Sequence, residues 1–167
     1  MPILNAHTLD LISHSPEQTR RLGAHLGALL QAGDLLCLEG DLGSGKTCLA
    51  QGIGLGLGVV EPITSPTFTL VAEYQPPLPA PPLYHIDLYR LGNPLDEALD
   101  MGLEEYVQGD GVCLIEWAER VTPLLPKEHL WLQLRHLDTS KRTILITARG
   151  KRYEELLAGF RQKAFGV

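Results

Sequence analysis

The 167-residue sequence predicts an α/β fold in three layers, with a largely parallel central sheet flanked by helices and an antiparallel hairpin near the C-terminus. Three observations support this prediction. Short, wholly apolar runs of the kind found inside parallel sheets alternate with helical patterns. A glycine-rich turn lies between the first of these runs and a helical segment. Finally, two alternating segments enclose a polar turn, which is typical of a hairpin.

The first helix is expected to begin after Ser15. The Ser15 hydroxyl can cap it, Pro16 presets φ in the first turn, and Gln18 lies where a capping box places its glutamine. Leucines at helical spacing follow, and Gly33 marks the expected end of this run.

A strand over residues 35–38 and a second helix from about Gly45 come next. Glycine weakens a helix interior by about 1 kcal/mol relative to alanine. We therefore expect this helix to end early or irregularly, because four glycines occur close together: Gly52, Gly54, Gly56 and Gly58.

The remaining elements alternate in the same way. The proline-rich segment 75–82 predicts an extended polyproline connector. No internal repeat or domain boundary is found, so residues 1–167 are expected to form a single domain. The other expected elements are strands 67–74, 83–88 and 112–115, short helices from Pro94 and Leu103, hairpin strands 129–137 and 142–149, and a helix over 151–163.

Composition narrows the class of protein. The net charge of -6, 44% hydrophobic residues and 20% charged residues are ordinary for a globular domain and exclude disordered, collagen-like and disulfide-scaffold proteins. No apolar run approaches the roughly 20 residues of a membrane span. Three cysteines without metal-ligand spacing are typical of buried thiols in a reducing compartment, so we expect a cytoplasmic protein with no membrane contact.

Charge is distributed unevenly along the chain. Residues 135–167 carry an excess of basic side chains, whereas residues 1–134 are acidic. Two interpretations stay open for this basic end: a solvated amphipathic face, or a surface that contacts a phosphate backbone or an acidic partner.

Residues 40–47 (GDLGSGKT) match the pattern G-x-x-x-x-G-K-[ST] between a predicted strand and a predicted helix. The glycines allow backbone N–H groups to face phosphate oxygens, and the helix N-terminus adds its positive dipole end. Lys46 can reach the β- and γ-phosphates, and the Thr47 hydroxyl can ligate Mg²⁺. The pattern predicts a P-loop rather than a glycine-rich turn with an exposed lysine.

Two carboxylates are candidates for the chemistry of such a site. His85, Asp87 and Tyr89 share one face of a predicted strand, and Glu116 ends the next apolar strand. If these strands are parallel to the first, Asp87 and Glu116 meet the P-loop at one edge of the sheet. Taken singly, Asp87 could cap a turn and Glu116 could pair with Arg120.

The segment around Pro66 is a candidate switch. Ser65 and Thr67 flank this proline just before a predicted strand, and their hydroxyls could respond to a γ-phosphate and Mg²⁺. The same residues are also ordinary turn chemistry. Trp117 either lies over the site or packs in the core.

Together these segments resemble the bacterial TsaE (YjeE-type) family, the small P-loop ATPases of tRNA threonylcarbamoyladenosine biosynthesis. The resemblance rests on 40–47, on 65–68 (SPTF), on 85–90 (HIDLYR) and on 115–119 (IEWAE), in an order and spacing that span roughly residues 15–120. Cys48 departs from the pattern, because the family usually has a second threonine there.

The resemblance implies a site for ATP and Mg²⁺. It implies that Thr47 and Glu116 lie at the metal, that Asp87 and Glu116 are catalytic, and that Ser65 and Thr67 belong to a switch. The segment from Ser15 to Thr19 is implied to lie at the adenine. The predicted nucleotide-binding residues are Ser15, Asp41, Gly43, Ser44, Gly45, Lys46, Thr47, Cys48 and Trp117.

The resemblance also implies partners: a two-protein complex that transfers threonylcarbamoyl to an adenosine of tRNA, with contact to tRNA itself left open. We expect weak ATP hydrolysis that increases within this complex, with Arg90 or Arg120 as candidates to stabilise the transition state. The alternative is a small-metabolite kinase of the P-loop class, although only Arg90 is available for an arginine-bearing lid. A signalling GTPase lacks its Asn-Lys-x-Asp element here, and a nucleotide-regulated binding module stays open.

Overall fold

A computed structural model describes residues 3–66 and 70–167. The strands are β1 (Ile3–Leu4), β2 (Thr8–Ser13), β3 (Leu35–Glu39), β4 (Val71–Tyr74), β5 (Leu83–Asp87), β6 (Val112–Glu116), β7 (His129–His136) and β8 (Arg142–Arg149). The helices are α1 (Pro16–Gly27), α2 (Lys46–Leu57), α3 (Pro94–Asp100), α4 (Leu103–Val107), the 3₁₀ helix η1 (Ala118–Leu124) and α5 (Lys151–Phe165).

The eight strands form one mixed sheet in the order β1-β2-β8-β7-β3-β6-β5-β4. The four central strands β7, β3, β6 and β5 are parallel, and the strands towards both edges pair antiparallel. The predicted parallel centre and C-terminal hairpin are therefore confirmed. Parallel pairing brings the carboxyl ends of β3, β5 and β6 to one edge of the sheet.

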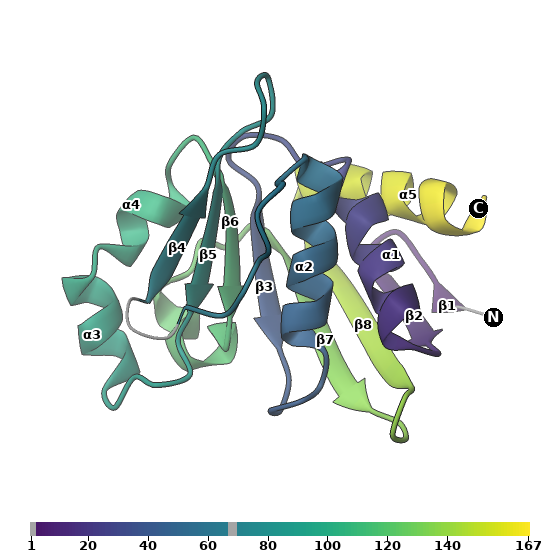
Figure 1. Cartoon of the computed structure of the whole chain (residues 1–167), viewed down its shortest axis with the longest axis horizontal. Helices are drawn as coiled ribbons and strands as arrows, with labels where there is room; N and C mark the ends of the chain where they lie inside the picture. The colour runs from purple at the N-terminus through teal and green to yellow at the C-terminus, as the bar shows by residue number, and fades with distance from the viewer. Residues whose placement is uncertain (1–2, 67–69) are drawn as a thin grey trace.

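Helices cover both faces of this sheet, as the three-layer prediction requires. Leu36 and Leu38 of β3 join the core formed with α1, α2 and α5. Leu35 and Cys37 point to the other face and join the core formed with α3, α4 and η1. Figure 1 shows α1 and α2 side by side on the face of the sheet that is turned towards the viewer. None of the helices in 3–66 and 70–167 combines the length and apolar character needed to cross a bilayer.

The predicted start of the first helix is confirmed. Ser15 is its N-cap and accepts a hydrogen bond from the backbone N–H of Gln18 at 3.0 Å. The Gln18 side chain reaches back one residue further than in a capping box and accepts from the His14 N–H at 2.6 Å. The helix ends at Gly27, before the predicted stop at Gly33, where φ is +91°.

The second helix does not end early, so that expectation is wrong. Helix α2 continues to Leu57, and Gly58 then terminates it with a φ of 95°. A Cβ on Gly52 would collide with the backbone carbonyl of Arg20, and one on Gly56 with the carbonyl of Ala24. Close packing of two helix backbones thus explains these glycines and offsets their low helix propensity.

Helix α1 contributes to the same contact. A Cβ on Gly23 would meet the carbonyl of Leu49, and one on Gly27 would meet the carbonyl of Ile53. Glycines on both helices therefore bring α1 and α2 closer together than side chains would allow.

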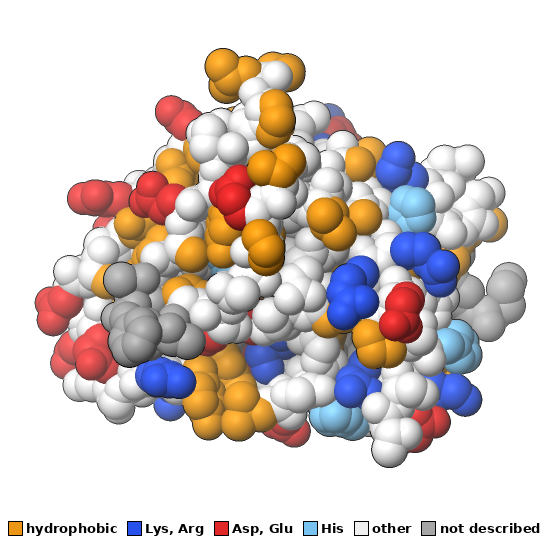
Figure 2. Space-filling model, viewed as in Figure 1, with side chains coloured by type: hydrophobic (Ala, Val, Ile, Leu, Met, Phe, Trp, Pro, Cys, Tyr) orange, Lys and Arg blue, Asp and Glu red, His pale blue; other side chains and the backbone are white. Residues whose placement is uncertain are grey.

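The proline-rich connector is not extended, contrary to the prediction. Its chain reverses where the Ala80 N–H donates to the carbonyl of Pro77 at 3.2 Å. The loop projects beyond the sheet in Figure 1, and hydrophobic side chains gather on it at the top of Figure 2. Leu78 at its tip is 86% exposed.

We expect the substitution Gly56→Ala to lower the free energy of unfolding by about 1–3 kcal/mol, the usual effect of overpacking. Gly159→Ala in α5 is the matched control. Its Cβ would come no closer than 3.4 Å to Leu29, so gained helix propensity should raise stability by up to about 1 kcal/mol. Urea denaturation of both variants measures the difference. Equal stabilisation by the two alanines would contradict the packing argument.

Candidate functional site

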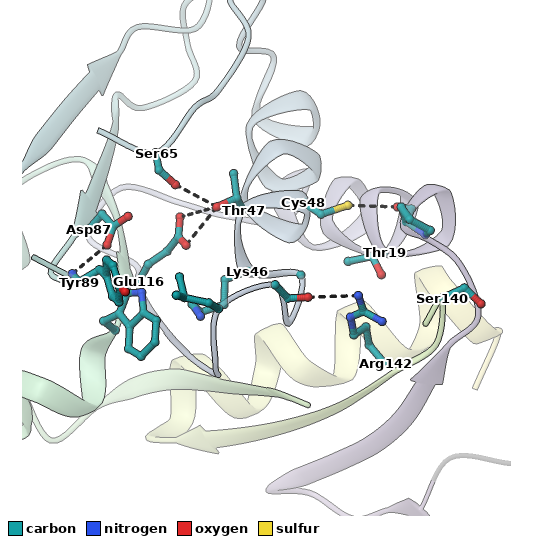
Figure 3. A pocket seen from close by; sticks show the side chains of 15 residues that line it. Thr19, Lys46, Thr47, Cys48, Ser65, Asp87, Tyr89, Glu116, Ser140 and Arg142 are labelled. Atoms are coloured by element: carbon teal, nitrogen blue, oxygen red, sulfur yellow. Dashed lines mark hydrogen bonds between the residues drawn. The ribbon is translucent and has the colours of Figure 1, made fainter. Parts of the chain in front are cut away.

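A cavity of about 330 Å³ opens at the carboxyl ends of β3, β5 and β6 (Figure 3). This volume lies within the range of small-molecule sites. Its lining combines the P-loop with strand ends, the start of α1 and the hairpin turn. The lining residues are Pro16, Thr19, Leu42, Gly43, Gly45, Lys46, Thr47, Cys48, Ser65, Asp87, Tyr89, Glu116, Trp117, Ser140 and Arg142.

The glycines shape the loop that leads into α2. Gly43 and Gly45 have φ values of 75° and 103°, in the left-handed region that favours glycine. Gly45 is the N-cap of the helix and has no side chain to cap it. The first N–H groups of α2 therefore have no intrahelical partner and can bind an anion, aided by the helix dipole.

Lys46 begins this helix and is held by its own loop. Its ammonium group donates to the carbonyls of Gly40 and Asp41, the latter at 2.9 Å. It also lies 4.1 Å from the centroid of the Trp117 ring, a cation–π contact. Burial lowers the pKa of Lys46, and the nearby carboxylate of Glu116 acts in the opposite direction.

Thr47 and Glu116 bring oxygen atoms together beside the loop. Glu116 is buried, and its two oxygens accept from the Thr47 hydroxyl at 3.2 and 3.4 Å. The Ser65 hydroxyl lies 3.0 Å from that of Thr47. A hydroxyl beside a carboxylate is a donor set that suits a hard cation such as Mg²⁺.

His85 fixes the orientation of the Glu116 side chain. Its Nε2 lies 2.6 Å from a Glu116 oxygen, and the imidazole is fully buried. The other ring nitrogen, Nδ1, has no hydrogen-bond partner within the described chain. A carboxylate without a proton only accepts hydrogen bonds, so we assign the donor in this contact to Nε2. Sequence reasoning placed His85 on the correct strand face and gave it no function.

Asp87 lies next to Glu116 because the two residues are paired in register across β5 and β6. Its carboxylate accepts from the Tyr89 N–H at 2.9 Å. Burial raises the pKa of Asp87, and the negative charge of Glu116 adds to this rise. The structure thus brings both predicted carboxylates to the P-loop, and their catalytic roles stay predictions.

A protein-family model described as "Threonylcarbamoyl adenosine biosynthesis protein TsaE" matches residues 13–144. The chain belongs to the TsaE family. Two relatives carry the name "tRNA threonylcarbamoyladenosine biosynthesis protein TsaE". The protein of Bacillus subtilis is 44% identical over 85% of this chain and 87% of the relative. The protein of Treponema pallidum is 46% identical over 81% of this chain and 97% of the relative. The crystal structure of Bacillus subtilis YdiB superposes with a TM-score of 0.77, at 37% identity and 97% coverage of both chains.

Several residues expected from the TsaE resemblance do not line this cavity. The Ser15 side chain caps α1 instead, and Pro16 and Thr19 reach the cavity from the same helix. Asp41 and Ser44 line a separate cavity of about 300 Å³ on the other side of the loop. Thr67 lies outside the described residues, so its part in a switch stays a prediction.

Trp117, by contrast, lines the cavity. This agrees with one of the two positions that the sequence left open for it. It has a φ of 63°, unusual for a residue with a side chain, and its ring lies 5.0 Å from that of Tyr89. Cys48 is the residue that departs from the family pattern. Its thiol donates a hydrogen bond to the Pro16 carbonyl at 3.2 Å. Burial raises the pKa of this thiol.

The two arginines proposed from the sequence do not line the cavity. Arg120 donates to the backbone carbonyls of Leu88 and Tyr89, at 3.0 and 2.6 Å, and so holds η1 against the end of β5. Arg90 is exposed. Arg142, which sequence analysis counted only as part of the basic end, does line the cavity and contacts the P-loop. No local motif signals it, because the hairpin brings it there.

We expect Asp87→Asn to raise the free energy of unfolding at pH 7. Because the pKa of Asp87 is raised in the folded state, its charged form lowers stability at neutral pH, and this effect disappears as pH falls through the folded pKa towards the unfolded value of about 3.9. The gain from Asp87→Asn should therefore shrink on acidification.

Urea denaturation between pH 4 and pH 8 measures this, with Asp100→Asn on the exposed end of α3 as the control for losing one negative charge. A loss of stability in Asp87→Asn at pH 7 would contradict the argument.

Proposed function

We propose that this chain is an ATPase that depends on Mg²⁺. We further propose that it acts in tRNA threonylcarbamoyladenosine biosynthesis, the process that the names of its relatives give. Its role there would be to support turnover of a two-protein threonylcarbamoyl transferase complex. The observation that carries the proposal is the meeting of a P-loop, a contact between Thr47 and the buried Glu116, and the Asp87 carboxylate at one cavity. The whole chain would act as one P-loop ATPase domain in the cytoplasm.

The residues present fit a nucleoside triphosphate. The first N–H groups of α2 have no side-chain cap, and the Lys46 ammonium group is held by carbonyls of the same loop. Lys46 would exchange its contacts with loop carbonyls for phosphate oxygens, which are stronger acceptors because they are charged.

The residues also fit Mg²⁺, which proteins usually hold through one or two carboxylates together with substrate phosphates. Thr47 and Glu116 would supply a hydroxyl and a carboxylate, which lie 3.2 Å apart. Within the described residues no three His, Cys, Asp or Glu side chains gather into a complete metal cage. When bound, Mg²⁺ would neutralise charge on the β- and γ-phosphate oxygens.

Asp87 is the residue that we assign to the attacking water. Its half-buried carboxylate lies beside Glu116 and can orient a water molecule and accept its proton as the new P–O bond forms and the bond to the leaving oxygen breaks. Lys46 would stabilise the charge on the transferred phosphoryl group. Among the described cavity residues the other cation is Arg142, which lies at the opposite end from Asp87 (Figure 3). Hydrolysis by the isolated chain should therefore be slow.

Lys46→Ala should weaken ATP binding by at least about tenfold, because a charge-assisted contact is worth about 1.5–3 kcal/mol. Glu116→Gln and Asp87→Asn should retain ATP binding in EDTA and lose most hydrolysis with Mg²⁺. Calorimetry measures the binding, and release of inorganic phosphate measures the hydrolysis. Intact hydrolysis in both carboxylate variants would refute their assignment. Transfer of the γ-phosphate to a metabolite would instead favour the small-metabolite kinase.

The partner complex should increase the rate of ATP hydrolysis. An arginine supplied by a partner accelerates phosphoryl transfer by about 10³–10⁵-fold in other P-loop enzymes, and the described site holds no arginine beside Asp87 and Glu116. Steady-state phosphate release with and without the transferase pair measures this effect. Equal rates would overturn the partner half of the proposal while leaving the ATPase half intact.

A further inference from the structure

His85 is a buried polar residue that lies behind the carboxylate side of the cavity. It belongs to β5, two residues before Asp87, and its side chain is 0% exposed. Glu116 lines the cavity and contacts both His85 and the Thr47 hydroxyl, whereas His85 itself is outside the cavity lining. Any effect of His85 on a ligand in the cavity is therefore transmitted through Glu116.

The two oxygens of the Glu116 carboxylate have different principal partners. Oε2 lies 2.6 Å from the His85 Nε2, and Oε1 accepts from the Thr47 hydroxyl at 3.2 Å. The His85 contact is the shorter of the two and comes from a ring whose backbone is fixed inside the sheet. It therefore sets the direction of the carboxylate, which Figure 3 shows turned towards Thr47. Oε1 keeps lone pairs that can bind a cation.

The backbone of His85 is held from both sides. It is paired with Leu114 of β6 in parallel register and with Ala72 of β4 in antiparallel register. The imidazole therefore reaches Glu116 from a central position of the sheet, and a movement of this ring would disturb two neighbouring strands.

The buried imidazole is costly for the fold. Burial of a polar group lowers stability unless the group is hydrogen-bonded, and the Nδ1 atom has no partner within the described chain. The contact with Glu116 satisfies only the other nitrogen. An apolar side chain would fill this position without an unpaired nitrogen, so the imidazole indicates a role in the site rather than in the core.

A second charged group in the cavity could compete for Glu116. Lys46 and Glu116 carry opposite charges and line the same cavity, yet the described residues include no ion pair between them. Lys46 instead donates to carbonyls of the P-loop, and Glu116 accepts from His85. A direct ion pair would occupy both the cation proposed for the phosphates and the carboxylate proposed for the metal. The hydrogen bond from His85 favours the arrangement in which these charges stay apart.

We propose that His85 is a positioning residue for the metal side of the site. Its Nε2–H group holds Glu116 so that Oε1 stays beside the Thr47 hydroxyl, where both can bind Mg²⁺ that accompanies a nucleotide. This inference rests on the proposed nucleotide function of the cavity. Because His85 acts through Glu116, its loss should reduce the gain in ATP affinity that Mg²⁺ provides and leave the affinity for metal-free ATP unchanged.

The test compares two substitutions that have similar reach and differ in their ability to donate a hydrogen bond. Calorimetry measures the affinity of each variant for ATP in Mg²⁺ and in EDTA, without reference to hydrolysis. Hydrogen-bond partners of metal ligands typically contribute about 10–100-fold to metal affinity. His85→Met should therefore reduce the Mg²⁺-dependent gain by about tenfold or more, with an unchanged Kd in EDTA. His85→Gln keeps an N–H group at a similar distance from the backbone and should retain most of the gain.

A double variant separates positioning from a general effect on structure. In protein that already carries Glu116→Gln, the additional change His85→Met should cause no further loss of the Mg²⁺-dependent gain, because effects transmitted through one residue are not additive. His129→Met is the matched control. His129 is a buried histidine at the start of β7, outside the cavity lining, and its Nδ1 lies 2.8 Å from the Pro126 carbonyl. This control should keep the full gain.

Four results would overturn the inference. They are an unchanged gain in His85→Met, an equal loss of affinity in Mg²⁺ and EDTA, a loss in His85→Gln as large as in His85→Met, and additive losses in the double variant. If His85→Met does not fold, His85→Asn replaces it with the same expectation, because its amide is too short to reach Glu116. Wild-type protein that binds ATP equally with Mg²⁺ and with EDTA would overturn the proposed Mg²⁺ dependence itself, whereas the results on variants would leave that function standing.

Discussion

The site depends on the parallel register of three neighbouring strands. Leu38 of β3 pairs with Glu116 of β6, and Glu116 pairs in turn with Asp87 of β5. One edge of the sheet therefore presents the P-loop, the buried carboxylate and the second carboxylate in adjacent positions. A shift of one residue in β6 would turn the Glu116 side chain to the opposite face and break its contacts with Thr47 and His85.

The opposite end of the cavity depends on how closely two helices approach. Glycines on α1 and α2 allow backbone contact, and this contact places the start of α1 against the start of α2. The hydrogen bond from the Cys48 thiol to the Pro16 carbonyl lies at that meeting point. Gly52 and Gly56, which weaken α2 as an isolated helix, therefore help to build the cavity, because tertiary packing outweighs helix propensity.

The hairpin formed by β7 and β8 forms a further wall of the cavity. Its strands extend the sheet past β3, and its turn returns the chain to the P-loop, where Arg142 contacts Gly43. Other basic residues of this end have structural partners: Arg152 binds Asp34, and Arg161 donates to the Asn5 carbonyl at 3.1 Å. These arginines therefore tie the C-terminal end into the domain, and both sequence interpretations of its exposed basic side chains stay predictions.

The sequence by itself determined the P-loop, the apolar strands, the hairpin, the Ser15 cap and the two candidate carboxylates, because each rests on local spacing of residue types. Local patterns say nothing about partners that are distant along the chain. The roles of Gly52 and Gly56, the buried contact of His85 with Glu116, and the approach of Arg142 to the loop were decided by the tertiary structure. Arg120 is close to Glu116 in the sequence, but its side chain binds the backbone at the end of β5. Packing in three dimensions, rather than proximity along the chain, therefore decides which side chains reach the cavity.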